Sequence, residues 1–131
     1  MHEVREIDRS ARPVQGKWCR ELLPGKHYFV VSCSDGAVNL PEIETLVYLG
    51  SAQMIAEDGR ALTGFLFQDA RSYYQDGDWS RVSEEQGGDL AAQGSVMFYD
   101  ADTVATIADI DGLLPLLNDL REHMRLLAKN R

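Results

Sequence analysis

The sequence predicts an α+β fold: a small curved antiparallel sheet or open barrel of about five strands, with a C-terminal amphipathic helix packed on it. Two observations predict this fold. Short segments rich in aromatic and β-branched residues, separated by turn dipeptides such as Pro24-Gly25 and Asp35-Gly36, occupy much of the chain up to position 100. Leucine and methionine residues then recur at helical spacing near the C-terminus.

The first long strand is predicted at residues 26–34, KHYFVVSCS. Aromatic and β-branched side chains occupy nearly every position there, which is typical of a strand buried on both faces. If the preceding segment, 17–23, is also extended, the two form an antiparallel hairpin about Pro24-Gly25.

Further antiparallel strands are predicted at 44–49 and 61–68, on either side of the turn signal Glu57-Asp58-Gly59. Residues 52–56 could add a short strand between them, and the sequence leaves this open. The segment 95–100, SVMFYD, predicts the last short strand.

The C-terminal helix is predicted to begin at Asp111, whose side chain can accept hydrogen bonds from free N–H groups, with Pro115 inside the first turn. A stripe of apolar residues follows at steps of four and three: Leu113, Leu117, Leu120, Met124 and Leu127. Residues 103–110 are predicted as a short helix of their own.

The composition of the 131-residue chain indicates one globular domain, at 15–131, preceded by a loose charged arm at 1–14. No apolar run approaches the roughly 20 residues of a membrane span, and the N-terminus has no secretory apolar core. Cys19 and Cys33 have no metal-type spacing, so we expect free thiols in a cytoplasmic protein.

The charge is unevenly distributed along the chain. Residues 1–26 carry a net charge of +2, residues 27–111 carry −12, and residues 112–131 carry +2, which together make −8. Such a chain disfavours nucleic acid as a partner and would attract basic proteins or cations. The alternative interpretation is that the acidity only keeps the protein soluble.

The segment Gly64–Ser80, GFLFQDARSYYQDGDWS, predicts a core strand followed by a candidate binding surface. Phe65, Leu66 and Phe67 are expected in the core. The candidate surface comprises three amphipathic rings and three carboxylates: Tyr73, Tyr74, Trp79, Asp69, Asp76 and Asp78. The alternative is that these rings cap a small core, with their polar atoms in water.

No motif in the sequence points to catalysis, a metal or a cofactor. His27 and Cys33 on one strand would lie about 20 Å apart, beyond hydrogen-bond reach, whereas Cys19 and His27 could meet across the hairpin only in one register. The histidines are scattered, and the acidic pairs lack the spacing of a calcium loop. We therefore expect no catalytic residues, metal ligands or cofactor.

The predicted C-terminal helix is apolar on more than one face. Leu114, Leu116 and Leu126 lie off the main stripe and are a candidate face for a symmetric homodimer. The alternative is that all of these leucines serve the core of a single copy.

The run ELLPGKHYFVVSCSDG, followed by IETLVYLG, resembles the opening of small uncharacterised bacterial domains with an SH3-like strand core. The shared positions are Leu23, Pro24, Gly25, Tyr28, Val30, Asp35 and Glu44, and the run covers about a quarter of the chain. The resemblance implies a strand-rich, SH3-like open barrel and implies no activity.

Two classes of function remain. The first is a non-enzymatic domain that binds a basic protein partner through its acidic, aromatic-bearing surface. The second is a small enzyme or ligand-binding domain, with a cleft between sheet and helix lined by Tyr28, Tyr48 or Trp79. The sequence favours the first.

Overall fold

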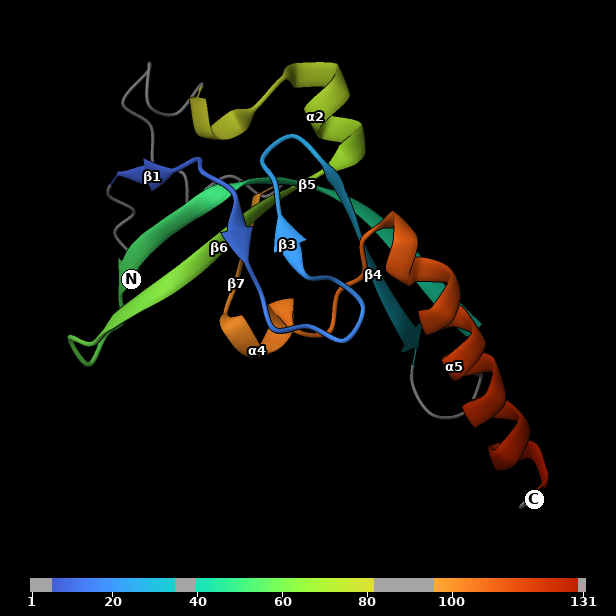
Figure 1. Ribbon diagram of the computed structural model, residues 1–131. Coiled ribbons are helices and arrows are strands. Elements are labelled where there is room, and N and C mark those ends of the chain that lie inside the picture. The colour runs from blue at the N-terminus through green and yellow to red at the C-terminus, as the bar shows by residue number, and fades with distance from the viewer. Residues whose placement is uncertain (1–5, 35–39, 82–95, 130–131) are drawn as a thin grey trace.

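A computed structural model describes residues 6–34, 40–81 and 96–129, and confirms the predicted α+β class (Figure 1). Its main sheet is antiparallel, five-stranded and open. The sheet strands are β1 (Ile7–Asp8), β4 (His27–Ser34), β5 (Leu40–Ile55), β6 (Ala61–Asp69) and β7 (Val96–Tyr99). A separate ribbon comprises β2 (Arg12–Pro13) and β3 (Glu21–Leu22). The helices are α2 (Ala70–Asp76), α4 (Ala101–Val104) and α5 (Ile110–Lys129).

Strand β5 is the centre of the sheet. Its first half pairs with β4, its second half pairs with β6, and β1 pairs with it at Ser51 and Ala52. The predicted strands at 44–49 and 52–56 are one strand, with an irregularity in the β6 pairing between Tyr48 and Gly50. Gly50 has a φ of 148°, and a Cβ there would lie 2.7 Å from the Asp8 carbonyl oxygen, so this glycine allows β1 to approach.

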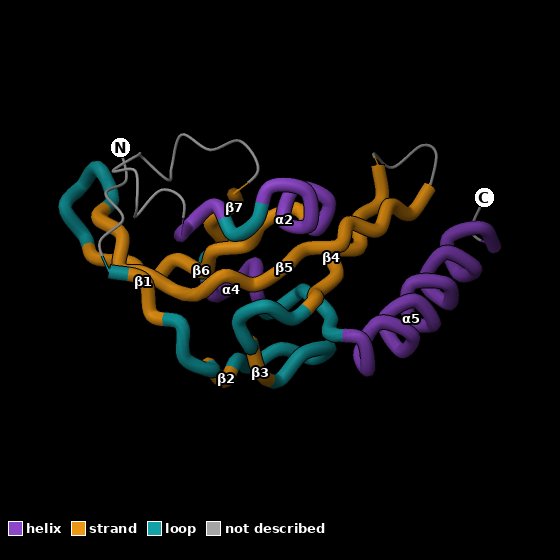
Figure 2. The backbone as a smooth tube through the Cα atoms, turned by 90° about the horizontal axis from the view of Figure 1, so that it is seen from above, coloured by secondary structure: helices purple, strands orange, loops and turns teal. Residues whose placement is uncertain are grey.

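Both faces of the sheet are covered (Figure 2). Helix α2 lies over one face, whereas α4 and the β2–β3 ribbon lie over the other. Alternate residues of β6 therefore enter different cores: Phe65 and Phe67 pack with Tyr28, and Leu66 packs on the opposite face. All three residues predicted as core on this strand are buried.

The hairpin that would have formed if residues 17–23 had extended along the following strand is absent from the structure. Glu21–Leu22 pairs with Arg12–Pro13, and the outer edge of β4 instead bonds to Ala108, through Phe29. The Tyr28 hydroxyl accepts a hydrogen bond from the Leu23 N–H (2.7 Å) and donates one to the Glu21 carbonyl (3.1 Å). These bonds hold the chain before Pro24 beneath the sheet rather than along its edge.

Part of the segment predicted as a loose arm, 1–14, is paired in the structure. Ile7–Asp8 forms β1 and Arg12–Pro13 forms β2, and Arg12 Nη1 donates to Ser51 Oγ at 2.9 Å. Residues 1–5 lie outside the described residues, as does the turn predicted at Asp35-Gly36.

The N-cap of the C-terminal helix is Asp109, two residues before the predicted cap, Asp111. Asp109 Oδ1 accepts the Gly112 N–H at 2.7 Å and the Asp109 carbonyl accepts the Leu113 N–H, so Asp109 caps α5 and Asp111 lies within its first turn. Pro115 consequently falls in the second turn. The residues predicted as a short helix, 103–110, contain only the end of α4 and the start of α5.

Helix α5 contacts the sheet through β4 and then runs outward, so that its C-terminal half extends beyond β4 and β5 (Figures 1 and 2). None of the α5 side chains that the structure describes is buried. Within the described ranges, no helix combines the length and the apolar character that crossing a membrane requires.

Candidate functional site

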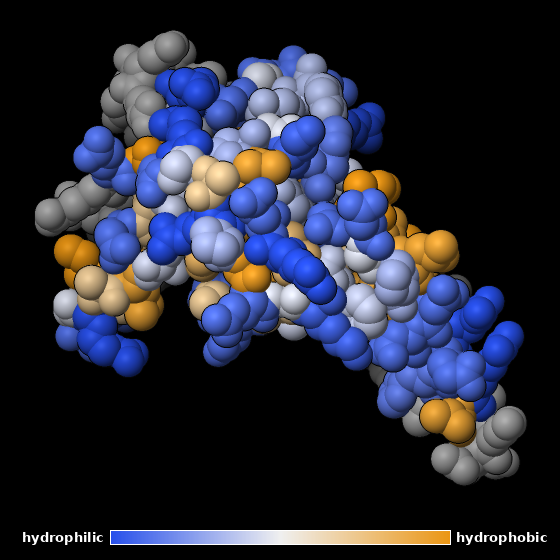
Figure 3. Space-filling model, viewed as in Figure 1, coloured by the Kyte–Doolittle hydropathy of each residue, from blue (hydrophilic) through white to orange (hydrophobic). Residues whose placement is uncertain are grey.

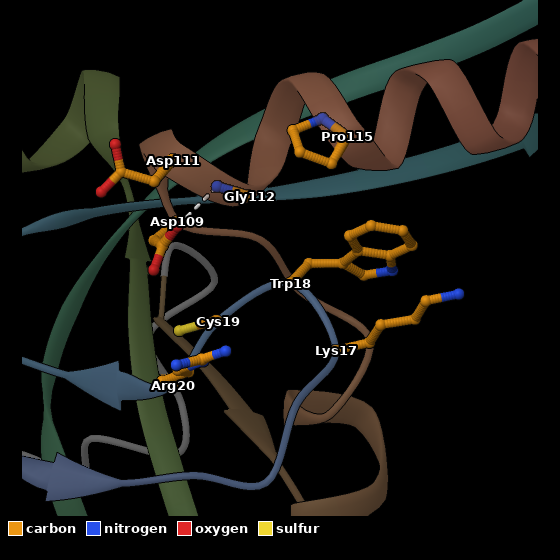
Figure 4. Close-up of a pocket in the computed structure, with 8 residues that line it drawn as sticks. All are labelled: Lys17, Trp18, Cys19, Arg20, Asp109, Asp111, Gly112 and Pro115. Atoms are coloured by element: carbon orange, nitrogen blue, oxygen red, sulfur yellow. Dashed lines mark hydrogen bonds between the residues drawn. The ribbon is translucent and has the colours of Figure 1, made fainter.

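A groove lies where segment 17–21, the start of β4 and the first turn of α5 meet. It has two hollows, of about 530 and 340 Å³, which share Arg20, Asp109 and Asp111 in their walls. We call this the α5 groove. Figure 4 shows the smaller hollow, with Lys17 and Trp18 on one side and Asp109, Asp111 and Pro115 on the α5 side.

The floor of the smaller hollow depends on a close backbone approach. The Trp18 carbonyl accepts the Asp109 N–H at 3.2 Å, and Trp18 forms a bridge with Ala108. A Cβ at Gly112 would clash with the Trp18 carbonyl oxygen. Only glycine fits at this position, and it joins the start of α5 to segment 17–21.

The smaller hollow carries a cation over an indole ring. Lys17 Nζ lies 4.7 Å from the centre of the Trp18 ring, within the range of a cation–π contact. Cys19 is buried beside it and its Sγ donates to the Glu21 carbonyl at 3.4 Å. Burial raises the pKa of this thiol, which makes it a poor nucleophile at neutral pH.

The larger hollow combines an apolar wall with charged rims. Tyr28, Phe29, Leu23 and Ile110 supply the apolar wall. The rims carry both signs of charge, from Glu21, Asp109, Asp111, Arg20 and Lys26, and the His27 ring also lines this hollow. Burial raises the pKa of Tyr28 to about 12, so its phenol stays protonated and keeps both of its hydrogen bonds at neutral pH.

The three aromatic residues of the predicted binding surface occupy different environments. Tyr73 and Trp79 are half-buried and pack against the core under α2. The backbone N–H of Trp79 donates to Oε1 of the buried Gln68 at 3.0 Å. Tyr74 is 66% exposed, and its Oη lies 2.6 Å from Nε2 of His27. Because His27 also lines the larger hollow, this contact places the Tyr74 hydroxyl next to the rim of the α5 groove.

The three aspartates of that surface also differ. Asp69 caps α2 by accepting the Ser72 N–H at 3.0 Å. Asp78 accepts from the Ser80 N–H and hydroxyl, and lies 3.7 Å from Nε of Arg81. Asp76 is exposed at the last position of α2, two residues after Tyr74. Tyr74 and Asp76 are therefore both exposed near the C-terminal end of α2, about 200° apart around the helix axis.

The candidate dimer face is only partly contiguous. Leu114 is 65% and Leu126 is 53% exposed, whereas Leu116 is half-buried. In Figure 3 apolar atoms gather near the N-terminal end of α5, and a separate apolar spot lies near its C-terminal end.

Sequence reasoning missed α2, the Trp18–Gly112 contact and the role of Asp109. The spacing Asp69-x-x-Ser72 was the available signal for α2, because an aspartate side chain at an N-cap accepts the N–H three residues later. The Trp18–Gly112 contact joins residues 94 positions apart and has no local signal. Among the described residues, no group of three or more His, Cys, Asp or Glu side chains could hold a metal ion.

Comparison of the chain with protein-family models, with curated proteins and with solved structures finds no match. The groove and the surface beside it must therefore be interpreted from their own chemistry.

Proposed function

We propose that the protein is a non-enzymatic binding domain that engages a basic protein partner through Tyr74, Asp76 and the adjoining rim of the α5 groove. The observation that carries this proposal is the large exposed ring of Tyr74, hydrogen-bonded to His27 at the rim of the larger hollow. A large aromatic side chain that is exposed yet held in place loses little entropy on binding, which favours its use as an interface anchor.

The chemistry of this surface suits a cationic side chain. One lysine or arginine of the partner can stack on the Tyr74 ring, and a second can pair with the Asp76 carboxylate. Glu21, Asp109 and Asp111 in the neighbouring hollow offer further acceptors. The net charge of −12 over residues 27–111 would steer a basic partner toward the protein and repel nucleic acid. Cytoplasmic localisation belongs to the same proposal, with Cys19 as a free thiol.

Asp76 is the most suitable of the three aspartates for testing the proposed binding by charge reversal. Reversing the charge at Asp69 or Asp78 would also break the hydrogen bonds that these carboxylates accept from the Ser72 and Ser80 backbone N–H groups. Asp76→Lys changes the charge at an exposed helix end, and Asp102→Lys makes the same change on α4, across the sheet from α2. Asp102→Lys is therefore the matched control.

The experiment measures the affinity of the wild type and of three variants, Asp76→Lys, Tyr74→Ala and Asp102→Lys, for a lysine- and arginine-rich peptide, by calorimetry at low and high salt. We expect Asp76→Lys and Tyr74→Ala each to weaken binding about fivefold, and Asp102→Lys to change it far less. Equal effects of Asp76→Lys and Asp102→Lys would mean that only net charge attracts the peptide. No binding by the wild type at low salt would contradict the proposal.

A small enzyme or ligand-binding domain is the second candidate. The observation that favours it is the larger hollow, where Tyr28 lines the wall and His27 meets Tyr74 at hydrogen-bond distance. Tyr48 is fully buried and Trp79 packs beneath α2, so neither lines this hollow. Fragment screening by NMR separates the two candidates: shifts confined to Tyr28, Phe29 and Ile110 would favour a small ligand.

A further inference from the structure

The apolar side chains of helix α5 cover more of its circumference than a single face packed on a sheet would occupy. At about 100° per residue, its apolar side chains spread over roughly two thirds of the circumference. The centre of this arc comprises Leu113, Leu116, Leu117, Leu120 and Met124, which we call the α5 stripe. Leu116, which was predicted to lie off the main stripe, lies within it, because it is only about 40° around the helix axis from Leu120. Leu114 lies beyond one border of the stripe and Leu126 beyond the other, and both are more than half exposed.

The rest of the chain leaves this surface incompletely covered. All five residues of the α5 stripe are half-buried, and none reaches the burial of Leu46 or Leu66 in the sheet. The helix is about 30 Å long, contacts β4 near its start, and extends beyond the sheet (Figure 1). A stripe of this kind is normally buried against another element.

The charges on α5 favour a second copy of the same helix as the element that covers the α5 stripe. The first ten residues of the helix, 110–119, carry a net charge of −2, and the last ten, 120–129, carry +2. Two antiparallel copies of the helix place each acidic half beside the other's basic half, and their helix dipoles also oppose. A parallel pair would place like charges together. The helix is thus electrostatically complementary to itself in one orientation, while residues 27–111, at −12, would repel a second copy.

We propose that α5 is a homodimerisation helix, and that its stripe packs antiparallel against the α5 stripe of a second copy about a two-fold axis. This arrangement buries the stripe of both copies and leaves Tyr74 and Asp76, on α2 over the sheet, available to another partner.

The first test measures the mass of the full chain in solution, by sedimentation velocity from 1 to 100 µM. We expect a dimer in this range. Leu120→Glu and Met124→Glu place a carboxylate in the middle and outer parts of the stripe, and should weaken dimerisation at least about a hundredfold. Asn118→Glu adds the same charge on the exposed side of the helix and should leave the dimer intact.

The second test determines orientation and does not depend on how the glutamate variants fold. Leu113 and Met124 lie on the same stripe on opposite sides of its midpoint, so an antiparallel pair brings Leu113 of one copy toward Met124 of the other. Under mild oxidation, a mixture of Leu113→Cys and Met124→Cys proteins should form the mixed disulfide faster than either protein cross-links alone.

A wild-type monomer at 100 µM would overturn the proposal, as would a dimer that both glutamate variants leave unchanged. Faster cross-linking of each cysteine variant with itself would overturn the antiparallel orientation. Because these experiments use the protein alone, their failure would leave the proposed binding of a basic partner unaffected.

Discussion

Tyr28 and Tyr48 lie in the same core, with their ring centres 6.4 Å apart in an edge-to-face contact. Their hydroxyl groups meet different surroundings. Tyr28 Oη accepts from the Leu23 N–H and donates to the Glu21 carbonyl. Tyr48 Oη is fully buried with no hydrogen-bond partner among the described residues. Burial raises the pKa of Tyr48, and the nearby Ser51 hydroxyl offsets part of that increase.

These surroundings predict opposite outcomes for one chemical change. Tyr28→Phe leaves the part-buried Leu23 N–H without its acceptor and removes the hydroxyl donor of the Glu21 carbonyl, which keeps only the weak Cys19 thiol, and should lower the free energy of unfolding by about 1–3 kcal/mol. Tyr48→Phe removes an unsatisfied hydroxyl, and should change stability by less than about 0.5 kcal/mol or increase it. Urea denaturation of both variants measures the difference. Equal losses would show that Tyr48 Oη has a partner, such as a buried water molecule.

At the residue scale, alternation along a strand was enough to predict Phe65, Leu66 and Phe67 as core. The same alternation could not predict that Tyr73 is half-buried and Tyr74 is exposed. Which of two adjacent rings faces the sheet depends on where α2 begins, because each helical residue turns the side chain by about 100°. That start is set by the Asp69 cap.

At the element scale, the start of α5 allows a direct comparison of the predicted and observed caps. Asp109→Ala removes the acceptor of the Gly112 N–H and should lower the free energy of unfolding by about 1 kcal/mol. Asp111→Ala removes only a favourable charge from the first turn, and should cost about 0.3–0.5 kcal/mol. Thermal unfolding of the two variants checks the order, and a larger loss for Asp111→Ala would place the cap where the sequence had predicted it.

The elements that could be predicted are those defined by local pattern: β4, the β5–β6 pair, β7 and α5. The β2–β3 ribbon could not be predicted from the sequence. A two-residue strand has too little pattern of its own, and the edge of β4 that residues 17–23 were expected to occupy is taken by Ala108, about 80 positions away. The strand pairing was therefore decided by competition between distant segments.

At the scale of the whole molecule, the α5 groove shows why the site was harder to predict than the fold. Its walls come from residues 17–29 and 109–115, which meet only after the sheet has formed. Tyr74 joins the rim from a third segment, through His27. The predicted surface named Tyr74 and Asp76, but the part played by His27, Trp18 and Asp109 depends on tertiary contacts that local pattern does not encode.

The core as a whole makes the protein sensitive to alkaline pH. Burial raises the pKa of Tyr28 from its ordinary value of 10.0 to about 12, and it also raises the pKa values of Tyr48, Tyr99 and Cys19. A group whose pKa is higher in the folded state loses its proton first in the unfolded chain. Its stabilising contribution is therefore complete below the unfolded pKa and is lost as the pH rises through the folded pKa.

We therefore expect the free energy of unfolding to begin falling near pH 9, where unfolded Cys19 ionises, and to fall most steeply between pH 10 and 12. Tyr28 alone should account for about 3 kcal/mol across those two pH units, about half of it by pH 11. Urea denaturation at pH 8, 10 and 11 measures the slope. The same series on Tyr28→Phe is the control, because that variant starts less stable yet should lose less stability between pH 10 and 11. Parallel pH dependence of the two proteins would mean that Tyr28 ionises equally readily in both states, and that its hydroxyl is not held within the core.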